Sequence, residues 1–176
     1  YSFNWLDPDK KIYVLQNRKY LKALRPMISA TGGVGFSNPF RNTYNIDPRI
    51  AFYFTEALGI EVFYTLTFNQ QNSTAQAIIA TGTGNYPVVR EITGMAGGLF
   101  HWVPWYAKIN VFNAILYFDW YFAAGGGAII STAINPSTGG GTVGQTLPAA
   151  FLSTGHLYHL SRLFLIRLDF SAAIYP

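Results

Sequence analysis

The chain has no cysteine and few charged residues. Without cysteine among its 176 residues, it can form no disulfide framework, thiolate metal site or cysteine nucleophile. Charged residues make up 11% of the chain, against about 25% in an ordinary soluble domain. Because 50% of the residues are hydrophobic and 17% are aromatic, little is left to solvate the outside of a globule. The composition favours a surface that largely faces lipid.

A targeting segment is missing as well. The N-terminus lacks the basic, apolar and small-residue regions of a signal peptide, and the chain opens on Tyr1 rather than Met. We therefore expect a mature or trimmed form, for which the missing signal peptide says nothing against secretion.

The formal charge of +4 is concentrated near the N-terminus. Residues 1–25 contain six cations and two acids, whereas residues 26–176 contain six of each. The six cations are Lys10, Lys11, Arg18, Lys19, Lys22 and Arg25. Since nucleic-acid binding needs a basic stripe on the folded body, we expect no nucleic-acid partner. The pattern predicts a solvated, basic periplasmic arm at 1–25 and a folded domain at 26–176. The alternative is an arm docked on an anionic head group, a cell-wall polymer or a partner protein.

Residues 109–130 contain one ionisable group, Asp119, and are long enough for a membrane helix, which needs about 20 apolar residues. Their period is nevertheless that of a strand. From 116 to 123, purely apolar residues alternate with a set that holds Asp119 and two tyrosines, as in a strand with one lipid-facing side. Three consecutive glycines, 125–127, would each cost a helix about 1 kcal/mol. The segment predicts two strands joined by a tight turn at Asn113 and Ala114, with the glycines in a crowded or bent stretch.

The same alternation recurs along the chain and separates charged from apolar residues. The charged phase, which we expect to face inward, contains Asp47, Arg49, Glu61, Lys108, Asp119, Arg167 and Asp169. The apolar phase, which we expect to face lipid, contains Ile46, Ile50, Phe52, Phe54, Ile60, Val62, Leu66, Phe118, Trp120, Phe122, Phe164, Ile166 and Leu168. Soluble sandwiches and lipocalin-like barrels bury the apolar phase instead. The scarcity of charge and the aromatic clusters near strand ends favour the membrane arrangement.

The inward charges, three cations and four acids, are expected to pair with one another, because an unpaired buried charge is very costly. Asp119 should find its partners among Arg49, Lys108 and Arg167. An eight-stranded barrel is narrow enough for side chains to fill its interior. A buried salt-bridge network is therefore favoured over a narrow ion or solute pathway.

The predicted fold class is all-β, a small antiparallel transmembrane β-barrel of about eight strands. Seven strands are recognisable, at residues 26–37, 43–54, 59–69, 104–112, 116–131, 142–152 and 161–173. Tight connections at 55–58 and 113–115 and long ones at 70–102 and 132–141 suit a barrel with short turns at one end. Because an open edge leaves backbone groups unpaired in lipid, an eighth strand is expected. It would come from chain beyond Pro176, which we favour, from residues 10–20, or from within 70–103.

A resemblance to a known family rests on seven short strings in a fixed order. They are "YVLQNRKY", "NPFRNTY", "FYFTEALGIEVFY", "WYAKINVFN", "LYFDWYFAAGGG", "VGQ" and "IRLDFSAAIY". Together they resemble an outer-membrane β-barrel domain family of gliding and predatory bacteria (myxobacteria and Bdellovibrio-like organisms) over most of residues 11–175. The resemblance implies the outer membrane of a Gram-negative bacterium, a closing strand after the last string and, for some relatives, a place in an envelope-spanning motility assembly. The poorly alternating stretch 146–160 departs from the family pattern.

The segment "STGHLYHLSR", residues 153–162, carries the residue types that catalysis at a barrel rim would need. A triad requires a third group to orient its base, and the nearest acid, Asp169, lies several residues further along. His156 and His159 have no third or fourth metal ligand in view. An interfacial turn is therefore favoured, and we expect no catalytic residue, no metal and no cofactor.

The function that these patterns predict is a non-enzymatic membrane anchor or scaffold. Its expected partners are outer-membrane lipid or lipopolysaccharide and periplasmic or other outer-membrane proteins. The alternatives are a porin-like pore or transport protein and, third, a lipid-modifying enzyme at the rim.

Overall fold

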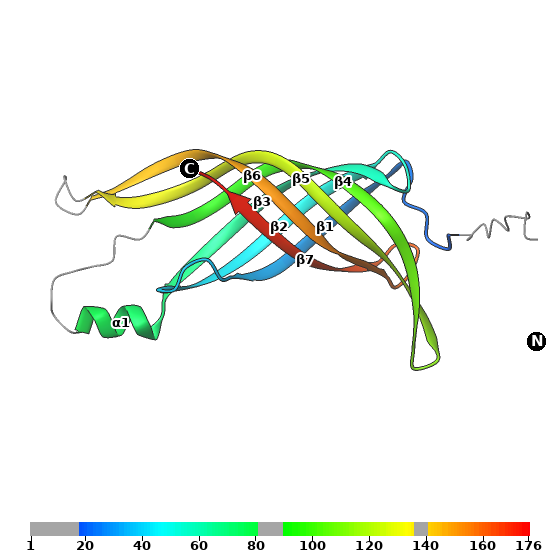
Figure 1. Ribbon diagram of the computed structural model, residues 1–176, viewed down its shortest axis with the longest axis horizontal. Coiled ribbons are helices and arrows are strands. Elements are labelled where there is room, and N and C mark those ends of the chain that lie inside the picture. Colours follow the sequence, from blue (N-terminus) through cyan, green and yellow to red (C-terminus); the bar gives the residue numbers. More distant parts are fainter. Residues whose placement is uncertain (1–17, 81–89, 136–140) are drawn as a thin grey trace, which may run out of the picture.

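A computed structural model describes residues 18–80, 90–135 and 141–176. They form a single antiparallel sheet of seven strands, paired in chain order (Figure 1). The strands are β1 (Arg25–Gly35), β2 (Arg41–Tyr53), β3 (Leu58–Gln71), β4 (Glu91–Val111), β5 (Ala114–Asn135), β6 (Gly141–His159) and β7 (Leu165–Ile174), and one helix, α1 (Ser73–Ala80), follows β3. The prediction of an all-β antiparallel fold is confirmed, and all seven strands recognisable in the sequence are present; the eighth strand stays a prediction. No helix in the described ranges is long and apolar enough to cross a membrane.

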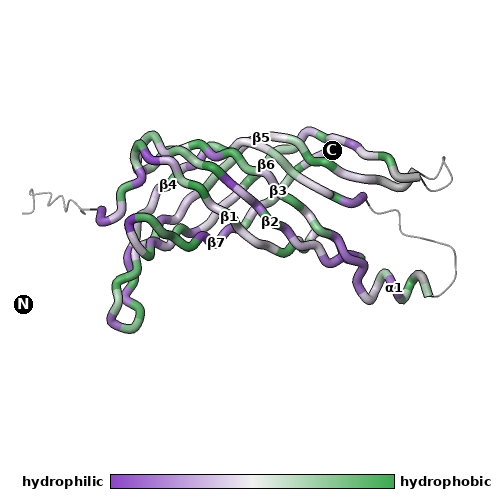
Figure 2. The backbone as a smooth tube through the Cα atoms, turned by 180° about the vertical axis from the view of Figure 1, so that it is seen from behind, coloured by the Kyte–Doolittle hydropathy of each residue, from purple (hydrophilic) through white to green (hydrophobic). Residues whose placement is uncertain are grey.

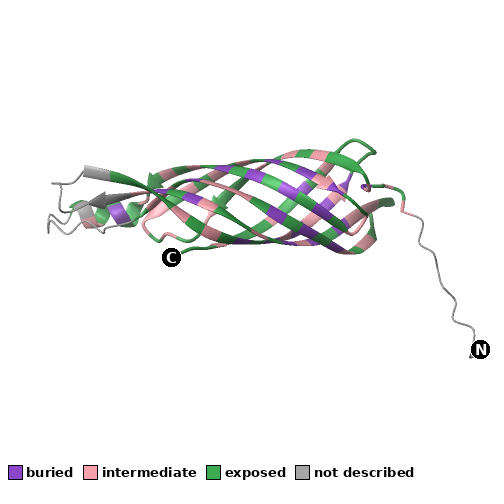
Figure 3. Ribbon diagram, turned by 90° about the horizontal axis from the view of Figure 1, so that it is seen from above, coloured by how far each residue is buried: buried purple, intermediate pink, exposed green. Residues whose placement is uncertain are grey.

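The sheet is strongly curled and has an inner and an outer face (Figure 3). β1 pairs with β2 alone and β7 with β6 alone, so no ladder within the described chain joins β1 to β7. The turns 54–57, 112–113 and 160–164 lie at one end, which we call the short-turn end. The connection 36–40, α1, the start of β4, the end of β5 and the start of β6 lie at the other, the long-connection end.

Burial alternates along the strands, as the period of two requires. Arg49 and Glu61 on the inner face are 5% and 1% exposed, whereas their neighbours Ile50 and Val62 on the outer face are 61% and 64% exposed (Figure 3). Every residue expected on the outward phase is exposed or half-buried. The inner face also holds apolar side chains, among them Tyr53 and Tyr121.

The hairpin predicted within residues 109–130 is present. Its turn lies one residue earlier than expected, at Phe112 and Asn113, whose φ angles are 47° and 62°. Both residues must adopt positive φ in the tight hairpin turn that best matches strand twist. Pairing between β3 and β4 ends at Leu58 and Trp102, so the last part of β4 and the start of β5 project as a two-stranded ribbon at the short-turn end (Figure 1).

Three of the strand boundaries expected from the sequence are wrong, those of β4 and β6 most of all, while β7 begins at Leu165 rather than 161. β4 begins at Glu91 rather than 104, so the long loop expected at 70–102 is α1 followed, after residues 81–89, by the first half of β4. Residues 91–103 therefore belong to β4 and do not supply the eighth strand that was considered within 70–103. β6 continues to His159, which makes most of the turn expected at 153–162 a strand. Residues 10–20 were one of the alternatives for the eighth strand. Of these, residues 10–17 lie outside the described part and 18–20 are not in a strand.

Glycine explains why the first half of β4 looks like a loop in sequence. Where β4 meets β5, the two backbones approach too closely for side chains. A Cβ atom on Gly125 would lie 1.9 Å from the carbonyl oxygen of Gly98, and one on Gly127 would lie 2.1 Å from that of Ala96. The crowding expected at the triple glycine is therefore present, and its cause is contact between backbones.

Candidate functional site

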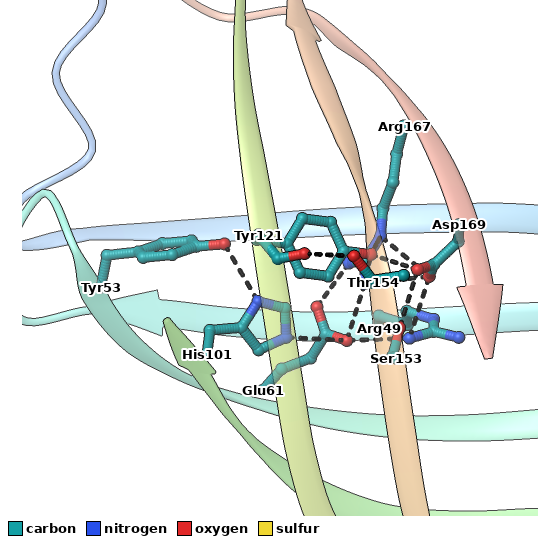
Figure 4. Close-up of polar contacts among 9 residues, drawn as sticks. All are labelled: Arg49, Tyr53, Glu61, His101, Tyr121, Ser153, Thr154, Arg167 and Asp169. Atoms are coloured by element: carbon teal, nitrogen blue, oxygen red, sulfur yellow. Dashed lines mark hydrogen bonds and ion pairs between the residues drawn. The ribbon is translucent and has the colours of Figure 1, made fainter. Parts of the chain in front are cut away.

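Charged side chains gather inside the curled sheet in two groups. The first, the central cluster, consists of Arg49, Glu61, Arg167 and Asp169 (Figure 4). Arg49 Nη1 lies 2.9 Å from Glu61 Oε1 and 3.3 Å from Asp169 Oδ2. Arg167 pairs with Glu61 and lies 3.0 Å from Asp169 Oδ2. The two cations and two carboxylates balance, and the Arg167–Glu61 pair spans the interior because β7 and β3 are not neighbours in the sheet.

Hydroxyl groups complete the hydrogen bonding of the central cluster. Arg167 Nη2 donates to the Tyr121 hydroxyl at 2.8 Å, and that hydroxyl donates to Asp169. Ser153 Oγ also donates to Asp169, at 2.8 Å. A buried charged pair needs such further hydrogen bonds to offset its desolvation.

His101 extends this network across the interior (Figure 4). Its Nε2 atom lies 3.4 Å from Glu61 Oε1, and its Nδ1 atom lies 3.4 Å from the Tyr53 hydroxyl. The ring also stacks on Tyr121, with centroids 4.8 Å apart. These three rings are no more than 1% exposed, so they fill the interior at this level.

The second group, the arm cluster, lies nearer the short-turn end and consists of Arg18, Lys22, Glu56, Asp119 and His159. Asp119 is 0% exposed, and its Oδ2 atom lies 2.7 Å from both Lys22 Nζ and His159 Nε2. Arg18 Nη1 lies 3.6 Å from Asp119 Oδ1 and 3.5 Å from Glu56 Oε2. Apart from the histidine, this group is also balanced, with the two cations Arg18 and Lys22 against the two acids Glu56 and Asp119.

The arm cluster fixes the residues before β1 inside the sheet. The Glu56 carboxylate accepts backbone N–H bonds from Lys22 and Ala23 at 3.1 and 3.0 Å. Tyr20 stacks on His159 at 5.1 Å. Burial lowers the pKa of the Lys22 ammonium group, and the Asp119 carboxylate opposes that shift. Lys22 is thus packed in the interior, with Arg18, Tyr20 and Ala23 half-buried beside it, so the described residues before 26 do not form the solvated arm that was expected.

The cations expected to form a partner-binding arm differ in how far they are buried. Lys22 is 6% exposed and Arg18 is half-buried, whereas Lys19 is exposed and Arg25 begins β1. Lys10 and Lys11 lie outside the described residues.

The structure brings together four of the seven residues expected in the inward network and separates the rest. The partners expected for Asp119 were wrong, because Arg49 and Arg167 belong to the central cluster. Lys108 was placed wrongly as well, because it is exposed on the projecting ribbon, beyond the enclosed interior. Asp47 is half-buried and forms no ion pair with any residue in the described ranges.

Sequence reasoning did not place four members of the arm cluster, Arg18, Lys22, Glu56 and His159, inside the sheet, and it missed His101 beside the central cluster. Lys22 was missed because it precedes β1 and has no strand period to mark its direction. His101 and His159 were missed because their strand segments were taken for a loop and a turn. In the correct strands both residues fall on the inward phase, opposite outward neighbours such as Trp102 and Tyr158.

Ser153, His156 and His159 do not come together in one group. His156 points to the outer face and stacks near Trp120, while His159 is buried inside, because an odd spacing on a strand puts residues on opposite faces. The pair therefore cannot share a metal ion, and no group of three or more ligating residues occurs in the described ranges. Ser153 contacts an acid directly and lacks a contact to a base among the described residues.

Comparisons with protein-family models, with curated proteins and with solved structures find no match for this chain.

Proposed function

We propose that the chain is an integral outer-membrane protein whose curled sheet forms most of the wall of a small β-barrel, and that it acts as a non-enzymatic anchor or scaffold. The observation that carries this proposal is the inverted distribution of polarity. Exposed side chains of the outer face are large and apolar, such as Ile28, Val62 and Phe170, which are 82%, 64% and 75% exposed. Charged groups lie within the curl. This is the arrangement expected where the surroundings are hydrocarbon and the interior is polar.

Aromatic residues support a boundary between membrane and water near the short-turn end. Trp105, Trp120 and Phe122 form a continuous outer cluster, with ring centroids 5.1 to 6.0 Å apart. Tryptophan and tyrosine favour the level of lipid head groups. At the opposite end, hydrophilic residues gather where β2 and β3 approach α1 (Figure 2). The apolar band would lie between these two levels.

The filled interior supports an anchor rather than a pore. The central cluster crosses the lumen from β7 to β3, and Tyr53, His101 and Tyr121 occupy the space beside it (Figure 4). An ion would have to break balanced, hydrogen-bonded pairs to pass. We therefore expect no stable single-channel steps from the pure protein in planar bilayers, and such steps would replace the anchor with a pore.

Quenching of tryptophan fluorescence by brominated lipid tests the membrane location. Trp102, Trp105 and Trp120 are 51%, 52% and 38% exposed on the outer face. A Trp5→Phe variant removes the one tryptophan outside the described residues. Folded into vesicles with brominated acyl chains, this variant should lose most of its fluorescence relative to the same variant in unbrominated vesicles. A protein that stays monodisperse without detergent and shows no quenching would contradict the proposal.

A further inference from the structure

The two-stranded ribbon at the short-turn end has no third strand beside it in the described chain. β4 pairs with β3 no further than Trp102, and β5 pairs with β6 only from Tyr117 onward. We call residues 104–116 the ribbon. It belongs to the middle of the strand order, away from β1 and β7. Because a two-stranded hairpin is marginally stable at best in water, we expect another surface to cover it.

A β-bulge at the base of the ribbon turns it aside. Between Trp102 and Trp105, two residues of β4 oppose a single residue of β5, Tyr121. An extra residue of this kind bends its strand. Beyond the bulge the ribbon runs across the long axis of the sheet rather than along it (Figure 1). In the proposed membrane location the sheet crosses the bilayer along that axis, so the ribbon extends sideways at the membrane surface.

The two faces of the ribbon differ in polarity. The face in phase with the outer face of the sheet is purely apolar and consists of Trp105, Ala107, Ile109, Val111, Ala114 and Leu116. Ile109 and Val111 are 42% and 39% exposed, and Phe112 at the turn is fully exposed. The opposite face contains Tyr106, Lys108 and Asn110. An element with one apolar and one cationic face is suited to the boundary between lipid and water.

Two cations gather on the polar face of the ribbon. Lys108 is exposed and pairs across the ladder with Tyr117. Lys19 Nζ lies 5.3 Å from the centroid of the Tyr117 ring, and the Lys19 N–H group donates to the Tyr106 hydroxyl at 3.2 Å. Neither lysine forms an ion pair within the described ranges, and residues 104–118 contain no acid. Uncompensated cations beside an apolar face complement a surface of anionic head groups.

We propose that the ribbon docks on anionic lipid head groups of the membrane that the sheet spans, with its apolar face toward the acyl chains and Lys19 and Lys108 at the phosphates. This inference rests on the proposed membrane location. The edges of the ribbon limit its depth, because their outward N–H and C=O groups have no strand partner in the described chain. Hydrocarbon does not tolerate such groups, whereas water and lipid oxygens at the head-group level can pair with them.

Fluorescent labels on neighbouring residues test which face is docked. Because the chain has no cysteine, Val111→Cys and Asn110→Cys place a single nitrobenzoxadiazole label on the apolar or the polar face. The full chain is folded into vesicles of equal parts phosphatidylglycerol and phosphatidylcholine, with nitroxides on the upper acyl chains. These should quench the label at 111 at least about threefold more than the label at 110. Val62→Cys, on the outer face of β3, reports lipid contact of the sheet itself. Equal quenching at 110 and 111 with strong quenching at 62 overturns the docking alone, whereas no quenching at 62 overturns the membrane location as well.

The charge of the lipid tests the role of the two lysines. In vesicles of phosphatidylcholine alone, quenching at 111 should be about threefold weaker than in the anionic vesicles. The double variant Lys19→Gln, Lys108→Gln should remove that difference. Arg90→Gln, which changes an exposed cation at the long-connection end, should retain it. Equal quenching in both lipids with the lysines unaltered overturns the proposal. So does quenching at 111 that appears only when each vesicle holds a single chain, because the apolar face is then covered by a second copy.

Discussion

Arg167 shows most directly how a single residue holds the interior together. It contacts Glu61, Tyr121 and Asp169 from the edge strand β7, so it links that edge to strands in the middle of the sheet. Arg167→Met would leave one arginine, Arg49, for two buried carboxylates. Removing one partner of a buried pair costs about 3 to 5 kcal/mol.

We therefore expect Arg167→Met to lower the free energy of unfolding by several kcal/mol in detergent or vesicles, measured by urea titration. Arg90→Met is the matched control, because Arg90 is exposed and makes only exposed hydrogen bonds in the described part of the chain. The control should change stability by less than about 1 kcal/mol. Equal effects of the two substitutions would mean that the central cluster contributes nothing to folding.

Asp119 has a different role, because it holds the segment before β1. Asp119→Asn would remove the carboxylate that faces both Lys22 and Arg18, which leaves the buried Lys22 ammonium group without an ion pair in the described ranges and Arg18 with Glu56 alone. We expect residues 18–24 to leave the interior and cleavage by trypsin after Arg18 or Lys22 to become at least tenfold faster. Asp47→Asn makes the same chemical change at an inner position without an ion pair in the described ranges. If both variants are cut at the same rate, the arm cluster does not retain the arm.

At the scale of elements, the contact between β4 and β5 depends on particular glycines. Gly126 and Gly127 are neighbours with opposite surroundings. A Cβ atom on Gly126 would lie 3.7 Å from its nearest contact, an ordinary separation, whereas one on Gly127 would lie 2.1 Å from a backbone oxygen. Gly126→Ala should therefore fold normally, and Gly127→Ala should be strongly destabilised or fail to fold. The fraction of heat-modifiable protein on a gel measures the difference, and similar fractions would show that the two backbones can separate at little cost.

The same glycines show how far sequence reasoning reaches. Alternation located β1, β2, β3 and β5 closely, because apolar and polar residues differ strongly at each step. The alternation failed over residues 91–103, because glycine and alanine there leave no clear difference in polarity between the two faces of the strand. Of the central cluster, all four charged residues were predicted from phase alone. Which charged residues pair with one another was not predicted. Ion pairs across the interior depend on how strongly the sheet curls and on how far the side chains reach, and the alternation along a single strand contains neither.

At the scale of the whole molecule, a charged residue introduced on the outer face tests whether that face is surrounded by lipid or by water. Val62 is 64% exposed on the outer face of β3, a strand that pairs with β2 on one side and with β4 on the other. In water, an arginine there would be harmless, since surface substitutions usually change stability by less than about 0.5 kcal/mol. In a bilayer, an arginine on the lipid face costs about 2 to 4 kcal/mol near the midplane and about 0 to 1 kcal/mol near the interface.

We expect Val62→Arg to destabilise the protein by about 2 to 4 kcal/mol in urea titrations of vesicle-inserted protein. Phe36→Arg is the control for depth, because Phe36 is 91% exposed in the connection between β1 and β2, beyond the proposed apolar band, and its substitution should cost less than about 1 kcal/mol. The ratio of the two losses in free energy of unfolding distinguishes the environments better than either loss alone, since a soluble protein would give small and similar values for both substitutions. Small and similar values would therefore remove the membrane from the proposed function.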